Sequence, residues 1–405
     1  MKKEMELYVH IPFCVKKCGY CDFLSMPADE KTQKAYVAAL LREIRYFGET
    51  CRDREVSTIY IGGGTPSWLQ EPYMELILKQ IQVSFCVAET AEISMECNPG
   101  TLTREKLRTY LRCGVNRLSI GLQSTLDDEL QALGRIHTYE QFLRNYELAR
   151  ELGYTNINLD LMSALPEQSV EKYITSLNRV IQLKPEHISA YSLIIEKGTP
   201  FYEKYKFDAV KREAGLLTEF LPGEDTEYEI YQKTQDILQK AGYLHYEVSN
   251  YARPGCECRH NIGYWKRKDY LGLGLGAASL MDNVRYTNIR ELQRYLEETT
   301  HLQKMEGRKE QGEALSYATN LHEQADGISR TGQIEEFMFL GLRMTEGIAR
   351  QEFFSNFNVQ IEGVYGDVLP RLAKEQLIES KAGQIKLTGR GMDISNYVLA
   401  QFLLD

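Results

Sequence analysis

Three cysteines lie close together near the start of the chain, at Cys14, Cys18 and Cys21. They follow a short apolar run, residues 7–13, whose alternation and β-branched content predict a strand that Pro12 ends. Thiolates this close repel one another unless a metal neutralises their charge. Loops of this kind hold iron–sulfur clusters, usually through four cysteines. The spacing therefore predicts a metal-binding loop at the carboxyl end of a first strand.

A fourth cysteine is missing from this loop, because Asp22 and Phe23 follow the third. A [4Fe-4S] cubane held by three thiolates keeps one iron open to a ligand that is not protein. A structural zinc site and a reactive thiol cluster are the alternatives. Zinc sites favour paired cysteines and need a fourth ligand, which His10 supplies only if it points to the same end of the strand. The spacing favours the cluster.

Composition limits the class of protein. The chain has 405 residues, 43% hydrophobic and 26% charged, which is typical of a soluble globular protein with two or three domains. A net charge of −9 argues against a general nucleic-acid-binding protein. The start resembles neither a signal nor a transit peptide, and no apolar run reaches the ~18 residues of a membrane span. Nine cysteines without a secretory signal indicate a protein of the reducing cytoplasm. We expect the protein to make at most peripheral contact with a membrane.

Strand-like and helix-like segments alternate about six times before residue 194. A repeat near the ~30 residues of a βαβ unit indicates parallel strands with helices outside. A full eight-fold barrel needs about 250 residues and eight such units, so the sequence predicts an α/β fold, a partial (β/α)6-type barrel. The expected strands are residues 7–13, 56–61, 92–97, 116–121, 156–162 and 187–194. The expected helices are 31–48, 71–83, 103–112 and 170–183, with helical runs between 127 and 152. A strand-like run at 243–251 and the stretch to 296 would close or cover the barrel.

The last hundred residues differ in pattern from the barrel. Residues 299–327 are polar and predict a linker or loosely packed connection. Three amphipathic helices, a short hairpin around Lys381-Ala-Gly383 and a final helix then suggest a winged-helix-like domain, although any compact helical cap fits the same pattern. The predicted organisation is a barrel with an accessory segment over 1–298, the connection over 299–327 and the C-terminal domain over 328–405.

Polar groups follow several of the predicted strands. In parallel barrels, ligands sit at the carboxyl ends of the strands, so these groups should converge. They are Gly62-Gly63-Gly64-Thr65, Glu96 and Asn98, Gln123 and Ser124, Asp160, and Tyr191 and Ser192. The glycines could instead form a tight turn, and Glu96, Asn98, Gln123 and Ser124 could cap helices.

Asp160 is the hardest of these to explain structurally. It lies in an apolar run, residues 157–162, that predicts burial, and a buried carboxylate needs a partner or a ligand hydroxyl. Arg135 is a candidate partner within the protein. For Asp160 and Glu96 together, contact with a ligand is the favoured interpretation.

A second group of chemically useful residues is Cys256-Glu-Cys258-Arg-His260-Asn261-Ile-Gly-Tyr264-Trp265. His260 is either a core histidine with both nitrogens satisfied or an imidazole ligand to iron or heme. In the second case Tyr264 and Trp265 would supply flat apolar surface for a macrocycle. Cys256 and Cys258 are alternative soft ligands. Spacing alone leaves these interpretations open.

Taken together, these motifs resemble the radical S-adenosylmethionine (SAM) superfamily, in its coproporphyrinogen-oxidase-like branch. The resemblance covers nearly the whole chain and rests on Tyr8-Val-His-Ile-Pro-Phe-Cys14-x₃-Cys18-x₂-Cys21, Gly62-Gly-Gly-Thr-Pro-Ser67, Glu96-Cys-Asn-Pro-Gly100, Arg117-Leu-Ser-Ile-Gly-Leu-Gln123, Gly134-Arg135 and Asp160. It implies a [4Fe-4S] cluster on Cys14, Cys18 and Cys21, with SAM on the open iron. It also implies SAM contacts at Tyr8, Tyr20, Gly63, Gly64, Thr65, Glu96, Gln123, Arg135 and Asp160.

Within this branch, two features differ from the oxidases. They carry a cysteine where this chain has Phe23, and a longer segment before the cluster than the thirteen residues here. By contrast, His260-Asn261-x₂-Tyr264-Trp265 resembles the motif of heme chaperones, which implies binding of heme and its transfer to heme-requiring respiratory proteins. The alternatives are an oxygen-independent coproporphyrinogen III dehydrogenase, which oxidatively decarboxylates a porphyrinogen, or another radical SAM transferase. The sequence does not predict whether SAM is cleaved, which protein accepts heme, or the oligomeric state.

Overall fold

Six parallel strands pair in chain order and form the centre of the molecule. The computed structural model describes residues 2–304, 317–381 and 383–404. The strands are β1 (Lys3–Ile11), β2 (Arg54–Gly63), β3 (Val87–Cys97), β4 (Arg117–Gln123), β5 (Ile157–Ser163) and β6 (His187–Ser192). Every neighbouring pair among them is parallel. The predicted partial (β/α)6-type barrel is therefore confirmed.

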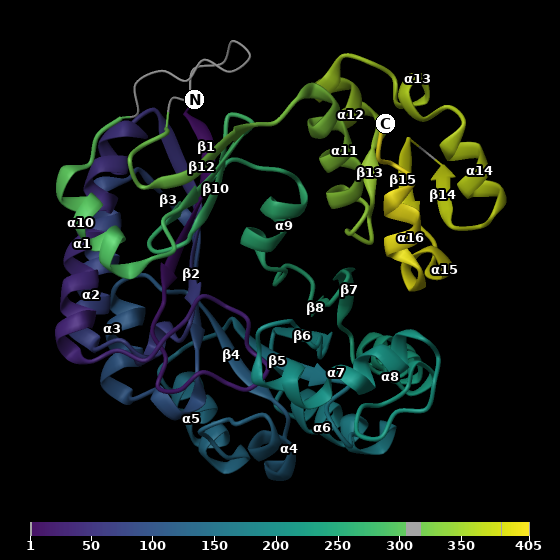
Figure 1. The fold of residues 1–405 in the computed structure, drawn as a ribbon, viewed down its shortest axis with the longest axis horizontal. Helices are drawn as coiled ribbons and strands as arrows, with labels where there is room; N and C mark the ends of the chain where they lie inside the picture. The colour runs from purple at the N-terminus through teal and green to yellow at the C-terminus, as the bar shows by residue number, and fades with distance from the viewer. Residues whose placement is uncertain (1, 305–316, 382, 405) are drawn as a thin grey trace.

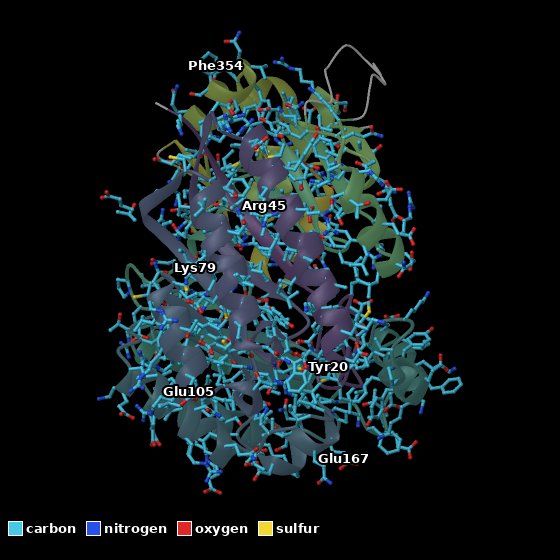
Figure 2. All side chains as sticks on the ribbon, turned by 90° about the vertical axis from the view of Figure 1, so that its left-hand side faces the viewer. Tyr20, Arg45, Lys79, Glu105, Glu167 and Phe354 are labelled. Atoms are coloured by element: carbon cyan, nitrogen blue, oxygen red, sulfur yellow. The ribbon has the colours of Figure 1, made fainter. Side chains whose placement is uncertain are left out.

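A layer of helices covers the outer face of these strands (Figure 1). It includes α1 (Glu30–Thr50), α2 (Glu71–Ser84), α3 (Arg104–Arg112), α4 (Asp127–Ala132), α5 (Tyr139–Glu151) and α6 (Val170–Gln182). Asp29 caps α1 by accepting a hydrogen bond from the backbone N–H of Thr32. Figure 2 shows this layer from outside, with Arg45 of α1 and Lys79 of α2 on its exposed surface.

The two faces of the barrel strands differ in polarity. In β1, Leu7 and Val9 belong to the apolar core under the helices, whereas Glu6, just before them, is buried but polar. Successive side chains of a strand point to opposite faces, so the polar residues line the inside of the barrel. Arg117 and Asn158 continue this buried polar set on β4 and β5. The interior is thus polar and suited to hold polar ligands.

Additional strands extend the sheet on both sides to twelve. Beyond β1 lie β9 (Tyr270–Leu273), β10 (Ala278–Met281), β11 (Val284–Asn288) and β12 (His322–Gly327), and beyond β6 lie β8 (Asn250–Ala252) and β7 (Leu244–Glu247). The single strand predicted at 243–251 is thus two antiparallel strands. Strand β12 falls inside the stretch predicted as a polar connection, of which residues 305–316 lie outside the described residues. The domain limits stay a prediction.

The described residues between β6 and the C-terminal part form the α-helices α7 (Pro200–Glu213), α8 (Glu224–Lys240), α9 (Arg259–Trp265) and α10 (Leu292–Glu298). The short helix α9 contacts both β2 of the barrel and α11 (Arg330–Gly341) of the C-terminal part (Figure 1). It therefore joins the barrel interior to the end of the chain. In the described ranges, no helix is long and apolar enough to cross a membrane.

The C-terminal part has its own hydrophobic core. After α11 come β13 (Ile348–Ala349), α12 (Arg350–Phe357), α13 (Ile361–Tyr365), α14 (Val368–Lys374), β14 (Ile378–Lys381), β15 (Gln384–Leu387), α15 (Gly389–Asp393) and α16 (Ser395–Ala400). The strands form a small sheet in the order β13-β15-β14 beside the helices, as a winged-helix-like unit requires. Thr345 holds this part to β7 through a backbone hydrogen bond of 3.0 Å to Tyr246.

Candidate cofactor-binding cavity

A cavity of about 460 Å³ lies inside the barrel and reaches the cysteine loop. Its size suits a small-molecule ligand, for which sites of about 300–1,000 Å³ are usual. The structure brings to it most of the residues predicted from sequence: Cys14, Cys18, Tyr20, Cys21, Gly63, Gly64, Thr65, Glu96, Gln123, Arg135, Asp160 and Trp265. Tyr8, His260 and Tyr264 do not line it. The predicted convergence of strand ends on one site is therefore observed.

The cysteine loop is held by its own backbone. The N–H of Cys14 donates to the carbonyl of Met26 over 3.1 Å, and that of Cys21 donates to the carbonyl of Cys18 over 3.2 Å. Burial raises the pKa of the Cys14 and Cys21 thiols, which favours their neutral form. A positively charged metal group would reverse this preference, because it stabilises thiolates.

The donor set of this loop fits an iron–sulfur cluster. Three soft sulfur ligands line one cavity, and Nη1 of Arg135 lies 3.7 Å from Sγ of Cys18, where its charge would stabilise a thiolate. In the described part of the chain, no three Cys, His, Asp or Glu side chains converge as ligands of one metal ion. A cubane does not require this, because each of its thiolates binds a different iron atom.

Glycines bring the end of β2 against the cysteine loop. Gly63 has a φ of +117°, and a Cβ there would lie 2.6 Å from Cε1 of His10. A Cβ on Gly64 would lie 2.8 Å from the carbonyl oxygen of Phe13. Only glycine fits such a close approach, so this segment shapes the cavity wall and does more than form a turn.

Two partly buried carboxyl groups, those of Glu96 and Asp160, line the cavity. Glu96 accepts hydrogen bonds from the N–H of Gly63 (3.0 Å) and the hydroxyl of Tyr60 (3.1 Å). Burial, with a smaller contribution from Asp160, raises the pKa of Glu96 to about 7. Burial also raises the pKa of Asp160, which accepts from Nδ2 of Asn158 at 2.7 Å. Glu96 caps no helix, which excludes the helix-capping role considered for it from the sequence.

Arg135 is not the hydrogen-bonding partner of Asp160. Its Nη2 donates to the carbonyl oxygen of Gly121 over 2.6 Å, and its Nη1 points to Cys18. The prediction of an Arg135–Asp160 pair is therefore wrong at contact distance. It rested on charge alone, whereas the loop after α4 directs the guanidinium to the cysteine loop.

The remaining strand-end residues divide between the cavity and the fold. Gln123, with a φ of +70°, accepts a hydrogen bond of 2.9 Å from the hydroxyl of Tyr191, and both line the cavity. Ser124 instead contacts Glu129 outside the cavity lining. Asn98 does both: it accepts a hydrogen bond from the N–H of Gly100, which caps a 3₁₀ turn, and it lines the cavity.

His260 lies at the base of the barrel interior, on α9. It is 1% exposed, with Nδ1 2.7 Å from Oγ1 of Thr58 and Nε2 2.9 Å from the hydroxyl of Tyr264. Burial lowers the pKa of His260 to about 3, so the imidazole is neutral. In this arrangement both imidazole nitrogens have protein partners. Cys258 is buried beside Glu92, whereas Cys256 is partly exposed.

Trp265 occupies a position that the sequence did not reveal. It lines the barrel cavity and also a second cavity of about 250 Å³ that Phe337 and Met344 of the C-terminal part help to form. The indole therefore separates the two spaces. Trp265 and Tyr264 were both predicted as a surface for a macrocycle, and of the two only Trp265 lines these two cavities.

Sequence reasoning missed several lining residues. They are Tyr60, Arg117, Ser119, Asn158, Ser189, Glu247, Ser249 and Asn250. A signal was present, because polar residues occupy alternate positions in two strands, at Arg117, Ser119 and Gln123 in β4 and at Asn158 and Asp160 in β5. Alternation in a strand with a buried apolar face indicates a second, polar face.

Comparisons with known proteins agree with these features. The model of the radical SAM superfamily matches residues 8–180, and that of the HemN C-terminal domain matches residues 328–394. The solved structure of the radical SAM enzyme coproporphyrinogen III oxidase (HemN) from Escherichia coli superposes with a TM-score of 0.81, covering 99% of this chain and 90% of that one. At 24% identity, this match establishes the fold.

Curated relatives identify the family. The heme chaperone HemW of Lactococcus lactis subsp. lactis (strain IL1403) is 34% identical over 405 residues, which is 100% of this chain and 99% of the relative. HemW of Bacillus subtilis (strain 168) is 35% identical over 98% of each chain, and HemW of Escherichia coli (strain K12) is 42% identical over 67% of this chain and 69% of the relative. The chain belongs to the HemW family of the radical SAM superfamily.

Proposed function

We propose that this protein is a heme chaperone that binds heme and passes it to heme-requiring proteins, respiratory proteins among them, in the cytoplasm. The observation that carries the proposal is similarity to heme chaperones along the whole chain, 34% over 405 residues. The segment His260-Asn261-x₂-Tyr264-Trp265 supports it, since it places an imidazole and two aromatic rings on one short helix.

Cys14, Cys18 and Cys21 would hold the [4Fe-4S] cluster. When bound, such a cluster accepts or donates one electron and offers an iron to a non-protein ligand. The chain supplies the thiols, fixes their loop through the backbone bonds of Cys14 and Cys21, and places the guanidinium of Arg135 beside Cys18. The positive charge would offset part of the negative charge of the thiolates.

The residues that would hold SAM lie on the facing strand ends. The carboxyl groups of Glu96 and Asp160 can accept hydrogen bonds from ammonium and hydroxyl groups, and the amide of Gln123 can donate or accept. Gly63, Gly64 and Thr65 offer close approach to backbone, and Tyr20 and Arg135 line the side of the cysteine loop. Tyr8 acts indirectly, because its hydroxyl contacts Nδ1 of His10 at 2.9 Å outside the cavity lining.

Heme binding through His260 would require α9 to leave its present seat. The contacts to Thr58 and Tyr264 would break, at about 0.5–1.5 kcal/mol for each hydrogen bond. Because the imidazole is already neutral, no proton has to leave before a nitrogen binds iron. Cys256 is the more accessible of the two alternative thiol ligands.

A coproporphyrinogen dehydrogenase is the second candidate, because the fold matches that of the oxidase along 99% of this chain. One experiment separates the two. The protein is reconstituted anaerobically with iron and sulfide, then mixed with heme and, separately, with coproporphyrinogen, SAM and a reductant. We expect stoichiometric heme binding in the absorbance spectrum and unchanged coproporphyrinogen by chromatography.

Variants identify the heme ligand. His260→Ala should weaken heme binding or alter its spectrum, and the triple variant of His260, Cys256 and Cys258 to Ala should do so more strongly. His322→Ala, in a buried histidine away from the cavity, is the matched control. Catalytic conversion of coproporphyrinogen by the wild type, or an unchanged heme spectrum and affinity in the triple variant, would refute the assignment.

A further inference from the structure

Arg117 is a buried cation for which the described residues provide no ion-pair partner. It is the first residue of β4, its side chain is 2% exposed, and it lines the barrel cavity. Among the described residues it forms no ion pair, and its buried Nε has no hydrogen-bond partner. An unpaired buried charge is costly, and natural proteins almost always pair one. A bound anion would therefore stabilise this guanidinium.

A second arginine of the same barrel shows how this fold treats a structural guanidinium. Arg54 on β2 is also 2% exposed, but it pairs with Asp269 at 2.5 Å and Asp282 at 2.6 Å and donates to Tyr317 at 3.0 Å. Arg117 has no such arrangement. The difference indicates that the Arg117 site is incomplete in the protein alone.

Two acids whose charge interacts with that of Arg117, Glu92 and Asp160, form hydrogen bonds to other groups. Glu92 accepts from the backbone N–H groups of Arg259 (3.0 Å) and His260 (3.3 Å) at the start of α9. Asp160 accepts from Asn158. Neither carboxyl group contacts Arg117, so its own N–H donors remain available to a molecule in the cavity.

Arg117 lies far from the cysteine loop. It pairs in register with Ser94 of β3, whereas the end of β4 that faces the loop is Gln123. Six residues of strand separate their backbones by roughly 20 Å. Close to Arg117 along the strands, the cavity is lined by Ser119, Asn158 and Ser189. Ser119 is in register with Glu96, and Ser189 with Asp160, so the Arg117 end of the cavity adjoins these two acids and lies away from the cysteine loop.

We propose that Arg117 marks a second subsite of this cavity, which receives a carboxylate group of the tetrapyrrole that the protein carries. The inference rests on the proposed function. A guanidinium binds a carboxylate through two parallel N–H···O bonds, a geometry that no other side chain provides. The propionates are the anionic groups at the edge of heme. Trp265 lines the same cavity and supplies an apolar wall for the neighbouring ring edge.

Esterified heme tests this subsite directly. Cluster-loaded wild type, Arg117→Gln, Arg117→Lys and the control Arg54→Gln are titrated with heme and with heme dimethyl ester. Wild type should prefer free heme, by roughly 10–100-fold for a lost charged hydrogen-bond pair. Arg117→Gln should bind both forms alike, and Arg117→Lys should recover little of the preference, because lysine lacks the planar fork. Arg54→Gln should keep the preference for free heme over its dimethyl ester.

Two further measurements exclude other roles for Arg117. If its partner is the amino-acid carboxylate of SAM, then Arg117→Gln will weaken SAM binding in heme-free protein and keep the preference for free heme, which overturns the inference. If Arg117 is a structural counter-ion, Arg117→Gln will lower the melting temperature of ligand-free protein as Arg54→Gln does, with the same consequence. We expect unchanged SAM affinity and no loss of melting temperature. Wild type that binds heme and its ester equally refutes only this subsite, whereas wild type that binds neither refutes the proposed function.

Discussion

At the scale of single residues, the cavity contains carboxyl groups whose pKa burial raises. Glu96 has a pKa of about 7, and burial raises that of Asp160 as well. Each has one or two protein donors, fewer than a carboxylate can accept. A ligand that brings positive charge and hydroxyl groups would complete both sites. Ionisation of these groups is thus coupled to binding.

Replacing Asp160 by alanine should weaken SAM binding and leave the cluster intact. A lost hydrogen bond costs about 0.5–1.5 kcal/mol, which lowers affinity by roughly 2–12-fold. Calorimetry on reconstituted protein measures the affinity, and iron and sulfide analysis measures the cluster. Asp128→Ala, in an exposed residue paired with Lys172 outside the cavity, is the control. If folded Asp160→Ala bound SAM with unchanged affinity, Asp160 would have only a structural role.

His137 should make stability depend on pH. Burial and the charge of Arg135 hold the pKa of this histidine at about 3, below the usual value of 6.5. The unfolded chain therefore takes up the proton first, and the wild type loses stability as pH falls below 6.5. His137→Gln removes this dependence. Its free energy of unfolding, relative to that of the wild type, should therefore rise by about 1.4 kcal/mol for each unit that the pH falls between about 6 and 4. Denaturant unfolding at several pH values measures the difference, and a constant difference would contradict the assignment.

At the scale of elements, α9 is the piece that closes the barrel interior. Glu92 caps its first N–H groups, His260 stacks on Tyr60 with ring centroids 5.2 Å apart, and Gly263 packs against the carboxyl group of Glu6. Burial raises the pKa of Glu6 to about 8, so this carboxyl group is mostly neutral at pH 7. The helix thus rests on a face that is polar but nearly uncharged.

Gly263→Ala should unseat α9, because a Cβ there meets the carboxyl group of Glu6. Overpacking of this kind costs about 1–3 kcal/mol. Glu6→Ala removes the obstructing group, so Gly263→Ala should cost less in that background. A double-mutant cycle from denaturant unfolding measures the coupling. Equal costs in both backgrounds would show that Glu6 does not seat the helix.

The elements that sequence could predict are those whose own pattern is long and periodic. Strands β1–β6 and their helices follow from alternation and helical spacing within each segment. The strands it missed depend on distant partners: β9 pairs with β1, and β12, with the polar sequence His-Glu-Gln-Ala-Asp-Gly, is held by backbone bonds to β11. The site residues show the same division between what local sequence predicts and what tertiary packing decides. Strand ends could be predicted to converge, but the direction of Arg135 and the burial of His260 depend on tertiary packing.

At the scale of the whole molecule, the barrel and the C-terminal part meet around α9. Arg267, just after α9, pairs with Glu336 of α11 at 2.8 Å, and Trp265 borders a cavity on each side. A shift of α9 that released His260 would therefore be felt by both parts. This arrangement gives the C-terminal part a physical route to influence heme binding.

Transfer of heme to an acceptor tests the heme-chaperone proposal most directly. Heme-loaded, cluster-containing protein is mixed with increasing concentrations of an apo heme protein from the respiratory chain, and with apomyoglobin as a passive scavenger. The account predicts that the rate of transfer rises with the concentration of the respiratory acceptor and exceeds the rate to apomyoglobin. A single rate, independent of the identity and concentration of the acceptor, would show simple dissociation and contradict it.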